Sequence, residues 1–205
     1  MTSISEDLKI QNRHGMPAGV LGLLDSFPRV SWDRLVPLSG LAAMWMGNHN
    51  WFRGKTESLC GSAGRLRGGL EEPTRFLPLF ERGLGSLLHQ LQVHHMVEDQ
   101  HYFPRFAHAV PSLKSGFDIL DDDHHTLHGA IDRLAGAGRE LIHALSDPEQ
   151  AQTHDRRGND RRRFVQDGMI AALGDFENIL TRHLADEEDL IIPLLLDRAR
   201  DPEFR

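Results

Sequence analysis

Apolar residues recur at spacings of three and four along four long stretches of this 205-residue chain, whereas alternating β-branched and aromatic residues are scarce. Such spacing places the apolar side chains of each stretch on one face of a helix, as in the helices of an antiparallel bundle. The predicted helices cover residues 38–59, 80–101, 117–145 and 173–194. The sequence therefore predicts an all-α fold, an antiparallel up-down four-helix bundle.

The regions outside these helices are less regular. Residues 1–36 carry two prolines among scattered apolar residues, which predicts an N-terminal arm packed along a helical domain of residues 37–200. Pro104 is expected to break or kink the second helix. The stretch 147–163 is polar and lacks apolar periodicity, so it predicts a solvated loop, with a docking surface for a partner as the alternative.

Each apolar face is interrupted by histidine or glutamate at a position where leucine would otherwise face the core. An unpartnered imidazole or carboxylate costs several kcal/mol when it is buried, and an ionised carboxylate costs more. Because all four predicted helices carry such an interruption, the polar groups are expected to meet around something bound between them. A metal ion accepts neutral imidazole nitrogen and carboxylate oxygen and removes the charge penalty.

The spacing of these residues supports a metal site, because positions four apart point the same way from a helix. The pairs with this spacing are His94 and Glu98, His124 and His128, and His183 and Glu187. The segments HHMVEDQHYFP and HLADEEDLIIP align without a gap, each with a proline ten residues after its first histidine, which indicates an internal duplication. His49 in the first half then corresponds to the helix of His124 and His128 in the second.

This ordered set of residues resembles that of the hemerythrin-like proteins, the HHE cation-binding domains, over about residues 38–197. The resemblance implies a four-helix bundle that holds a non-haem di-iron centre, two iron ions joined by an oxo or hydroxo bridge. By position it implies that one iron is bound by His124, His128 and His183, the other by His49 and His94, with Glu98 and Glu187 bridging both. Oxygen-carrying members place an aspartate five residues after the last histidine, where this chain has Glu188. We favour Glu187 as the ligand, with Glu188 as the alternative, and the departure argues against a simple oxygen carrier.

Several residues near these positions have two interpretations. His101 and Tyr102 follow Glu98 by about one turn and are candidates for an extra ligand or a hydrogen-bond donor, or are ordinary residues at the bundle end. Asp123 is expected on a solvated helix face, with orientation of a ligand imidazole as the alternative. His95 and His125 point about 100° away from their neighbours and are expected at the surface. The other histidines, which show no pairing, are expected at the surface or in loops: His14, His89, His108, His143 and His154.

Composition narrows the functional classes. The 23 basic and 30 acidic residues give a formal net charge of −7 without a basic stripe, so neither nucleic acid nor an anionic membrane is an expected partner. Cys60 is the only cysteine, which excludes an internal disulfide and a CxxC motif. No apolar run is long enough to cross a bilayer and the start lacks the basic residues of a signal peptide, so a cytoplasmic protein is expected.

The leading functional hypothesis is a di-iron protein that binds or reacts with dioxygen, peroxide or nitric oxide. Two octahedral ions offer about twelve positions. The seven side chains would fill about nine of them, because each bridging glutamate counts twice, and an oxo or hydroxo bridge would fill about two more. About one position is then left for a small ligand. One alternative is a metal-responsive regulatory or iron-handling module without catalysis, and another is a di-iron oxidoreductase. The repair proteins of this fold usually carry a cysteine-bearing N-terminal domain, and residues 1–36 contain no cysteine. The sequence assigns no catalytic residue and identifies no protein partner.

Overall fold

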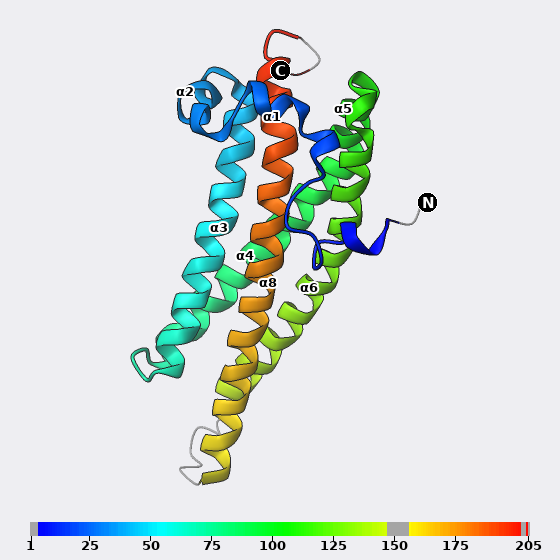
Figure 1. Ribbon diagram of the computed structural model, residues 1–205. Coiled ribbons are helices and arrows are strands. Elements are labelled where there is room, and N and C mark those ends of the chain that lie inside the picture. The colour runs from blue at the N-terminus through cyan, green and yellow to red at the C-terminus, as the bar shows by residue number, and fades with distance from the viewer. Residues whose placement is uncertain (1–3, 147–155, 202–203, 205) are drawn as a thin grey trace. The chain divides into compact units, whose positions relative to one another are not determined.

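The computed structural model describes residues 4–146, 156–201 and 204, and no strand occurs among them. Four long helices can be followed in Figure 1. They are α3 (Gly40–Arg67), α4 (Pro73–Val97), α6 (Lys114–Ser146) and α8 (Arg156–Asp197). The predicted all-α helical bundle is confirmed, since most of each stretch of apolar spacing lies in one of these helices. Pro73 is the first residue of α4, a position that needs no backbone N–H.

The fourth helix is longer than its apolar pattern predicted. It begins at Arg156, so the expected loop is wrong for residues 156–163, while residues 147–155 and His154 lie outside the described part of the chain. The added turns are rich in arginine, which is a good helix former and remains hydrated on the surface of an exposed helix. None of the described helices is long and apolar enough to cross a membrane.

The second predicted helix changes its winding before Pro104. The α-helix α4 ends at Val97, a π-helix η5 follows over Glu98–Tyr102, and α5 (Phe103–Ala109) contains Pro104 in its first turn. Proline has no N–H and its ring collides with the carbonyl four residues earlier, so regular α-helix cannot run through it unchanged. Single π-turns of this kind are frequent at functional sites. The short 3-10 helix η6 (Pro111–Leu113) then leads into α6.

Residues 4–38, which include most of the predicted N-terminal arm, form a series of short helices. In chain order these are η1 (Glu6–Leu8), η2 (Ala18–Val20), α1 (Gly22–Ser26), η3 (Arg29–Ser31), α2 (Trp32–Leu35) and η4 (Val36–Leu38). Met16, Val20, Trp32 and Val36 are buried in a hydrophobic cluster with residues of the long helices. We call residues 4–38 the N-terminal segment. The domain boundary at residue 37 stays a prediction.

The chain divides into two compact units. Unit 1 comprises Met1–Trp51, His95–Thr126 and Ile179–Arg205, and unit 2 comprises Phe52–His94 and Leu127–Asn178. In unit 2 the buried positions of the long helices are almost all apolar, and glycines allow close packing. A side chain at Gly138, for example, would collide with Leu84.

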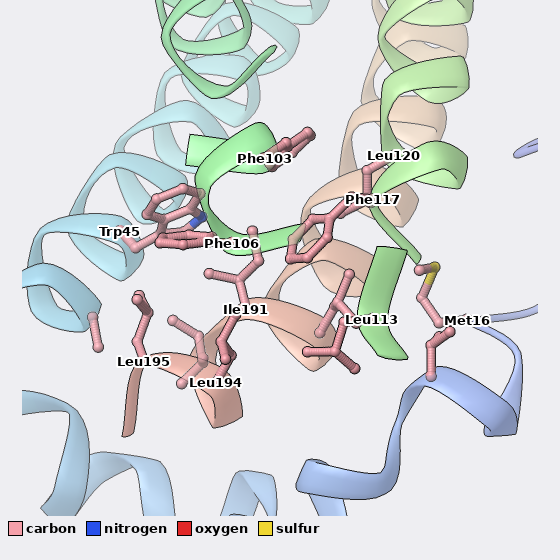
Figure 2. Close-up of a cluster of buried hydrophobic side chains, with 14 of the residues drawn as sticks. Met16, Trp45, Phe103, Phe106, Leu113, Phe117, Leu120, Ile191, Leu194 and Leu195 are labelled. Atoms are coloured by element: carbon pink, nitrogen blue, oxygen red, sulfur yellow. The ribbon is translucent and has the colours of Figure 1, made fainter. Parts of the chain in front are cut away.

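Unit 1 combines an apolar core with buried ionisable residues. Figure 2 shows part of that core, in which the ring of Trp45 lies against Phe106 and the side chains of Ile191 and Leu195 approach from α8. Phe204 also belongs to this core, and its ring stacks on that of Phe106 at a centroid distance of 5.1 Å. The buried ionisable residues of the same unit therefore lie beside a largely apolar core, in which the indole of Trp45 carries an N–H donor.

Candidate metal centre

Three histidines from three helices meet in the interior of unit 1. His95 comes from α4, His124 from α6 and His183 from α8, and each is at most 1% exposed. Their nearest ring nitrogens all lie within 4.8 Å of one another. The Nε2 atoms of His124 and His183 are 3.2 Å apart, and the ring of His95 stacks on that of His124 at 4.0 Å. Two nitrogens that each lie about 2.1 Å from one ion at right angles are about 3 Å apart, so this spacing suits a metal.

This triad differs from the set that the resemblance implied. His95, expected at the surface, is fully buried, whereas the side chain of His128 is exposed and lies outside the triad. The expectation for His95 was wrong because its 100° offset from His94 directs it to α6 and α8 instead of to solvent. On α6 the next buried positions after His124 are Leu127, Ala130 and Ile131, which leaves residue 128 on the outer side of the helix. His125 is exposed, as expected.

A second group contains His49, Glu98 and Glu187, which are all at most 1% exposed and have ligand atoms within 4.8 Å of one another. The two carboxylates also reach the histidine triad. One oxygen of Glu187 lies 3.4 Å from His49 Nε2, and the other lies 3.2 Å from His183 Nε2. Glu98 Oε2 lies 3.6 Å from His124 Nε2. Both glutamates therefore lie between His49 and the histidine triad, where a carboxylate can bridge two cations.

Glu187 and Glu188 have different surroundings. Glu187 faces the Nε2 atoms of two histidines and accepts a hydrogen bond from the indole N–H of Trp45. Glu188 lies on the other side of the His49 ring, with Oε1 3.0 Å from Nδ1. This arrangement favours Glu187 as the ligand and gives Glu188 the role of holding the ring. Trp45, a buried residue of the core, is a hydrogen-bond donor to the site as well.

His94 precedes His95 in α4 and belongs to unit 2. It is half-buried, and its ring packs against that of Phe52 at a centroid distance of 5.0 Å. Its assignment as a ligand stays a prediction.

Carboxylates face the Nδ1 atoms of three buried histidines. Besides Glu188 at His49, Asp99 Oδ1 lies 2.7 Å from Nδ1 of His124, and Asp123 Oδ2 lies 3.4 Å from Nδ1 of His183. An Nδ1–H donated to a carboxylate leaves Nε2 as the atom with a free lone pair, which is the usual arrangement of histidine ligands. The expected solvated position is therefore wrong for Asp123, which is fully buried, and the alternative, an orienting carboxylate, fits its contacts.

The internal duplication contains a signal for two of these acids. Asp99 follows Glu98 and Glu188 follows Glu187 at equivalent positions of the repeated segments. Each contacts the histidine that the other half of the repeat supplies, His124 and His49 respectively. Sequence reasoning missed both residues, although the repeated acidic pair could have identified them.

No pattern in the sequence indicates the role of Arg13. Its guanidinium is buried and donates to Asp123, with Nη1 2.7 Å from Oδ1, and to Asp186, with Nε 2.9 Å from Oδ2. Nothing in the spacing of the N-terminal residues predicts contact with α6 and α8. Such a contact depends on the tertiary path of the chain alone.

Burial and charge together determine the protonation of the site. Burial, with the nearby charge of Glu187, raises the pKa of Glu98 well above its ordinary value. Burial also opposes ionisation of Glu187, but the charge of His49 and a hydrogen bond from His183 hold its pKa well below the usual range. Although burial disfavours charged His183, hydrogen bonds to Asp123 and Glu187 raise its pKa to about 9. Burial lowers the pKa of His124.

These shifts describe a site that retains protons where a metal would otherwise supply positive charge. A proton on Glu98 and another on His183 compensate the buried carboxylates, and a divalent cation can replace them. The donors are neutral imidazoles and carboxylates, which suit iron, zinc and manganese. The residues present therefore fit a metal centre.

The two residues that follow Glu98 by about a turn, His101 and Tyr102, differ in their exposure to solvent. His101 is exposed, which fits the interpretation as an ordinary residue at the bundle end and not that as an extra ligand. The π-helix has more residues per turn than an α-helix, which rotates position 101 outward. Tyr102 is half-buried, and its ring meets Trp45 edge-on at 5.0 Å.

Comparison with known proteins agrees with this geometry. The family model for the hemerythrin HHE cation binding domain matches residues 41–195, about three quarters of the chain. Neither a curated protein nor a solved structure gives a significant match. With buried histidines and glutamates converging from α3, α4, α6 and α8, the chain belongs to the hemerythrin HHE cation-binding domain family.

Proposed function

We propose that this chain binds two iron ions and uses them to bind or react with dioxygen, peroxide or nitric oxide. The residues that would hold the two ions are His95, His124 and His183 for one, His49 and His94 for the other, and Glu98 and Glu187 between them. The observation that carries the proposal is the position of the Glu187 carboxylate, which faces His49 on one side and His183 on the other.

When bound, two irons supply redox chemistry toward small oxygen- and nitrogen-containing molecules. The protein's own contribution is to position the ligands and to keep water out. The indole N–H of Trp45 holds one oxygen of Glu187, while Asp99 and Glu188 hold the rings of His124 and His49. The raised pKa of Glu98 lets that carboxyl hold a proton inside the site. The buried aromatic and aliphatic residues of unit 1 surround these groups with apolar surface.

Iron is the metal that membership of the family implies. Nitrogen and oxygen ligands bind copper and zinc more tightly than ferrous iron, so the ligand set alone does not select it. We also propose a cytoplasmic location. The proposed partner is a small molecule and not nucleic acid or an anionic membrane, because the chain is acidic overall.

A second candidate is a metal-responsive regulatory or iron-handling module without catalysis. It is supported by the contact of Arg13 with the carboxylate that holds His183, because this contact connects the metal ligands to the N-terminal segment. In this function the metal would stabilise a conformation that another protein recognises.

Metal analysis and optical spectroscopy separate these functions. We expect close to two iron ions per chain in protein reconstituted with ferrous iron without oxygen. Absorption is then recorded as the reduced protein meets air, hydrogen peroxide or nitric oxide. Reversible bands indicate a carrier or sensor, consumption of peroxide indicates an enzyme, and bound metal without any optical response favours the regulatory module. A chain that binds no metal would contradict the proposal.

A further inference from the structure

The N-terminal segment carries two arginines that contact the outer carboxylates of the metal centre. The segment, residues 4–38, lies outside the part of the chain that matches the family model, residues 41–195. Arg13 contacts Asp123, which faces His183, and Arg29 contacts Glu188, which faces His49. Two separate chains of contacts, each histidine to carboxylate to arginine, therefore end on the same short segment.

The Arg13 connection is fully internal. The side chain of Arg13 is 3% exposed and those of Asp123 and Asp186 are 0% and 4% exposed. The guanidinium donates to Asp123 through both terminal nitrogens and to Asp186 through Nε. Two-pronged contact of this kind fixes the plane of the carboxylate as well as its charge. Because Asp123 also faces Nδ1 of His183, the orientation of that ring depends on where Arg13 lies.

The Arg29 connection lies nearer the surface. Its side chain is 46% exposed, yet it makes three contacts with one turn of α8. Nη1 lies 3.4 Å from Glu188 Oε2, Nε lies 2.7 Å from Asp189, and Nη2 lies 2.8 Å from the carbonyl of Ala185. The guanidinium also lies over the ring of Trp32 at 4.8 Å, which holds it in place from the other side. Glu188 in turn faces Nδ1 of His49.

From these contacts we infer that the N-terminal segment is part of the metal centre and that Arg13 and Arg29 are positioning residues. They act through Asp123 and Glu188 on the ligands His183 and His49. Groups that hold the ligands of a metal contribute to its affinity, and the coupling is reciprocal, so bound metal also stabilises the docked segment. The inference rests on the proposed metal-binding function.

Metal titration of arginine variants tests the first half of the inference. Arg29→Met keeps an unbranched apolar stem and removes the donors at a position that is 46% exposed. Arg13→Lys keeps the buried charge and removes the two-pronged contact. We expect each to weaken binding of the first or second ferrous ion by about 3- to 10-fold. Arg34→Met, at an exposed position of the same segment, is the matched control and should bind metal as the wild type does.

A double-variant comparison separates positioning from general destabilisation. Asp123→Asn should weaken binding by about 10- to 100-fold, and in that background Arg13→Lys should add little, because the contact through which it acts is gone. Full additivity of the two losses would show that Arg13 acts on stability alone and would overturn its positioning role.

Hydrogen exchange tests the second half. Amides of residues 8–31 in the wild-type protein should exchange about tenfold or more slowly after ferrous ions bind. The inference is overturned if folded Arg29→Met and Arg13→Lys proteins bind both ions with wild-type affinity. It is also overturned if the amide exchange rates of the N-terminal segment are the same with and without metal. Failure of the wild-type chain to bind metal would instead contradict the proposed function, so the two failures are distinguishable.

Discussion

The Nε2 atoms of His124 and His183 face each other at 3.2 Å, while the Nδ1 atom of each ring faces a carboxylate. If both rings donate from Nδ1, two lone pairs point at one another in an apolar interior. A positive charge between them removes that repulsion. A proton on His183 supplies it in the metal-free protein, and a metal ion can supply it in the loaded one.

Metal affinity should therefore depend on pH. The pKa of His183 is raised to about 9, and metal must displace that proton. Below pH 9, ferrous binding should weaken by about tenfold for each pH unit, with release of protons that a dye can measure. Affinity that stays constant between pH 6.5 and 8.5 would contradict protonated His183.

The same proton predicts how stability changes with pH in the metal-free protein. The pKa of His183 rises from its ordinary 6.5 to about 9 on folding, so protonated His183 stabilises the fold fully below pH 6.5. This contribution, about 3 kcal/mol, is lost as the pH rises through 9. Urea unfolding at pH 6 and pH 9 measures it. His183→Gln should remove most of the difference, and an unchanged difference in that variant would assign the effect to other groups.

Variants of His95 and His128 test which ligand set is correct, the buried triad in the structure or the set that the family resemblance implied. His95→Ala should lower metal content by about one ion per chain, because His95 lies in the buried triad. His128→Ala should leave metal content unchanged, because that side chain is exposed. Inductively coupled plasma mass spectrometry of both variants, prepared side by side, gives the answer. The opposite result would restore the ligand set implied by the resemblance.

The helices were predictable from the sequence, whereas parts of the site were not. Apolar spacing identifies the face of each helix that is buried, and Trp45, Phe52 and Leu59 on α3 or Leu173 and Phe176 on α8 are buried as that spacing predicts. Spacing assigns one buried face to a helix. It does not decide between His94 and His95, because Leu91 is followed by His94 at a spacing of three and by His95 at a spacing of four. The fully buried one of the two is His95.

The outer contacts of the ligands could be predicted only in part. The sequence indicates Asp99 and Glu188, since each follows a glutamate at equivalent positions of the repeat. It indicates Asp123 only weakly, as the residue directly before His124. It does not indicate Arg13, because the contact of Arg13 with Asp123 joins positions 110 residues apart through an irregular segment. The change to a π-helix at Glu98 also depends on a local winding that apolar spacing does not report.

Trp45 should affect the metal centre through one hydrogen bond. Trp45→Phe removes the indole N–H that Glu187 accepts while keeping an aromatic ring in the core. We expect metal affinity to fall by about tenfold. Trp51→Phe, at a side chain that is 41% exposed, is the control and should bind metal normally. Equal affinity in both variants would show that Glu187 does not need this donor.

Substitutions at two glycines, Gly116 and Gly54, should change the stability of the protein in opposite directions. A Cβ at Gly116 would lie 2.8 Å from Leu190 Cδ2, so Gly116→Val should destabilise the metal-free protein by about 1–3 kcal/mol. A Cβ at Gly54, inside α3, would meet nothing within 4 Å, so Gly54→Ala should stabilise by about 0.5–1 kcal/mol. Urea unfolding measures both. A tolerated valine at position 116 would contradict the close packing of α6 on α8 in unit 1.

Metal content of the wild type and of His183→Ala, measured on the same day after identical reconstitution with ferrous iron, tests the central claim most directly. His183 belongs to the triad and contacts Glu187, so its loss should affect both ions. We predict about two ions per chain in the wild type and fewer than one in the variant, with both proteins helical by circular dichroism. Equal metal content in the two proteins, or none in either, would contradict a metal centre built from these residues.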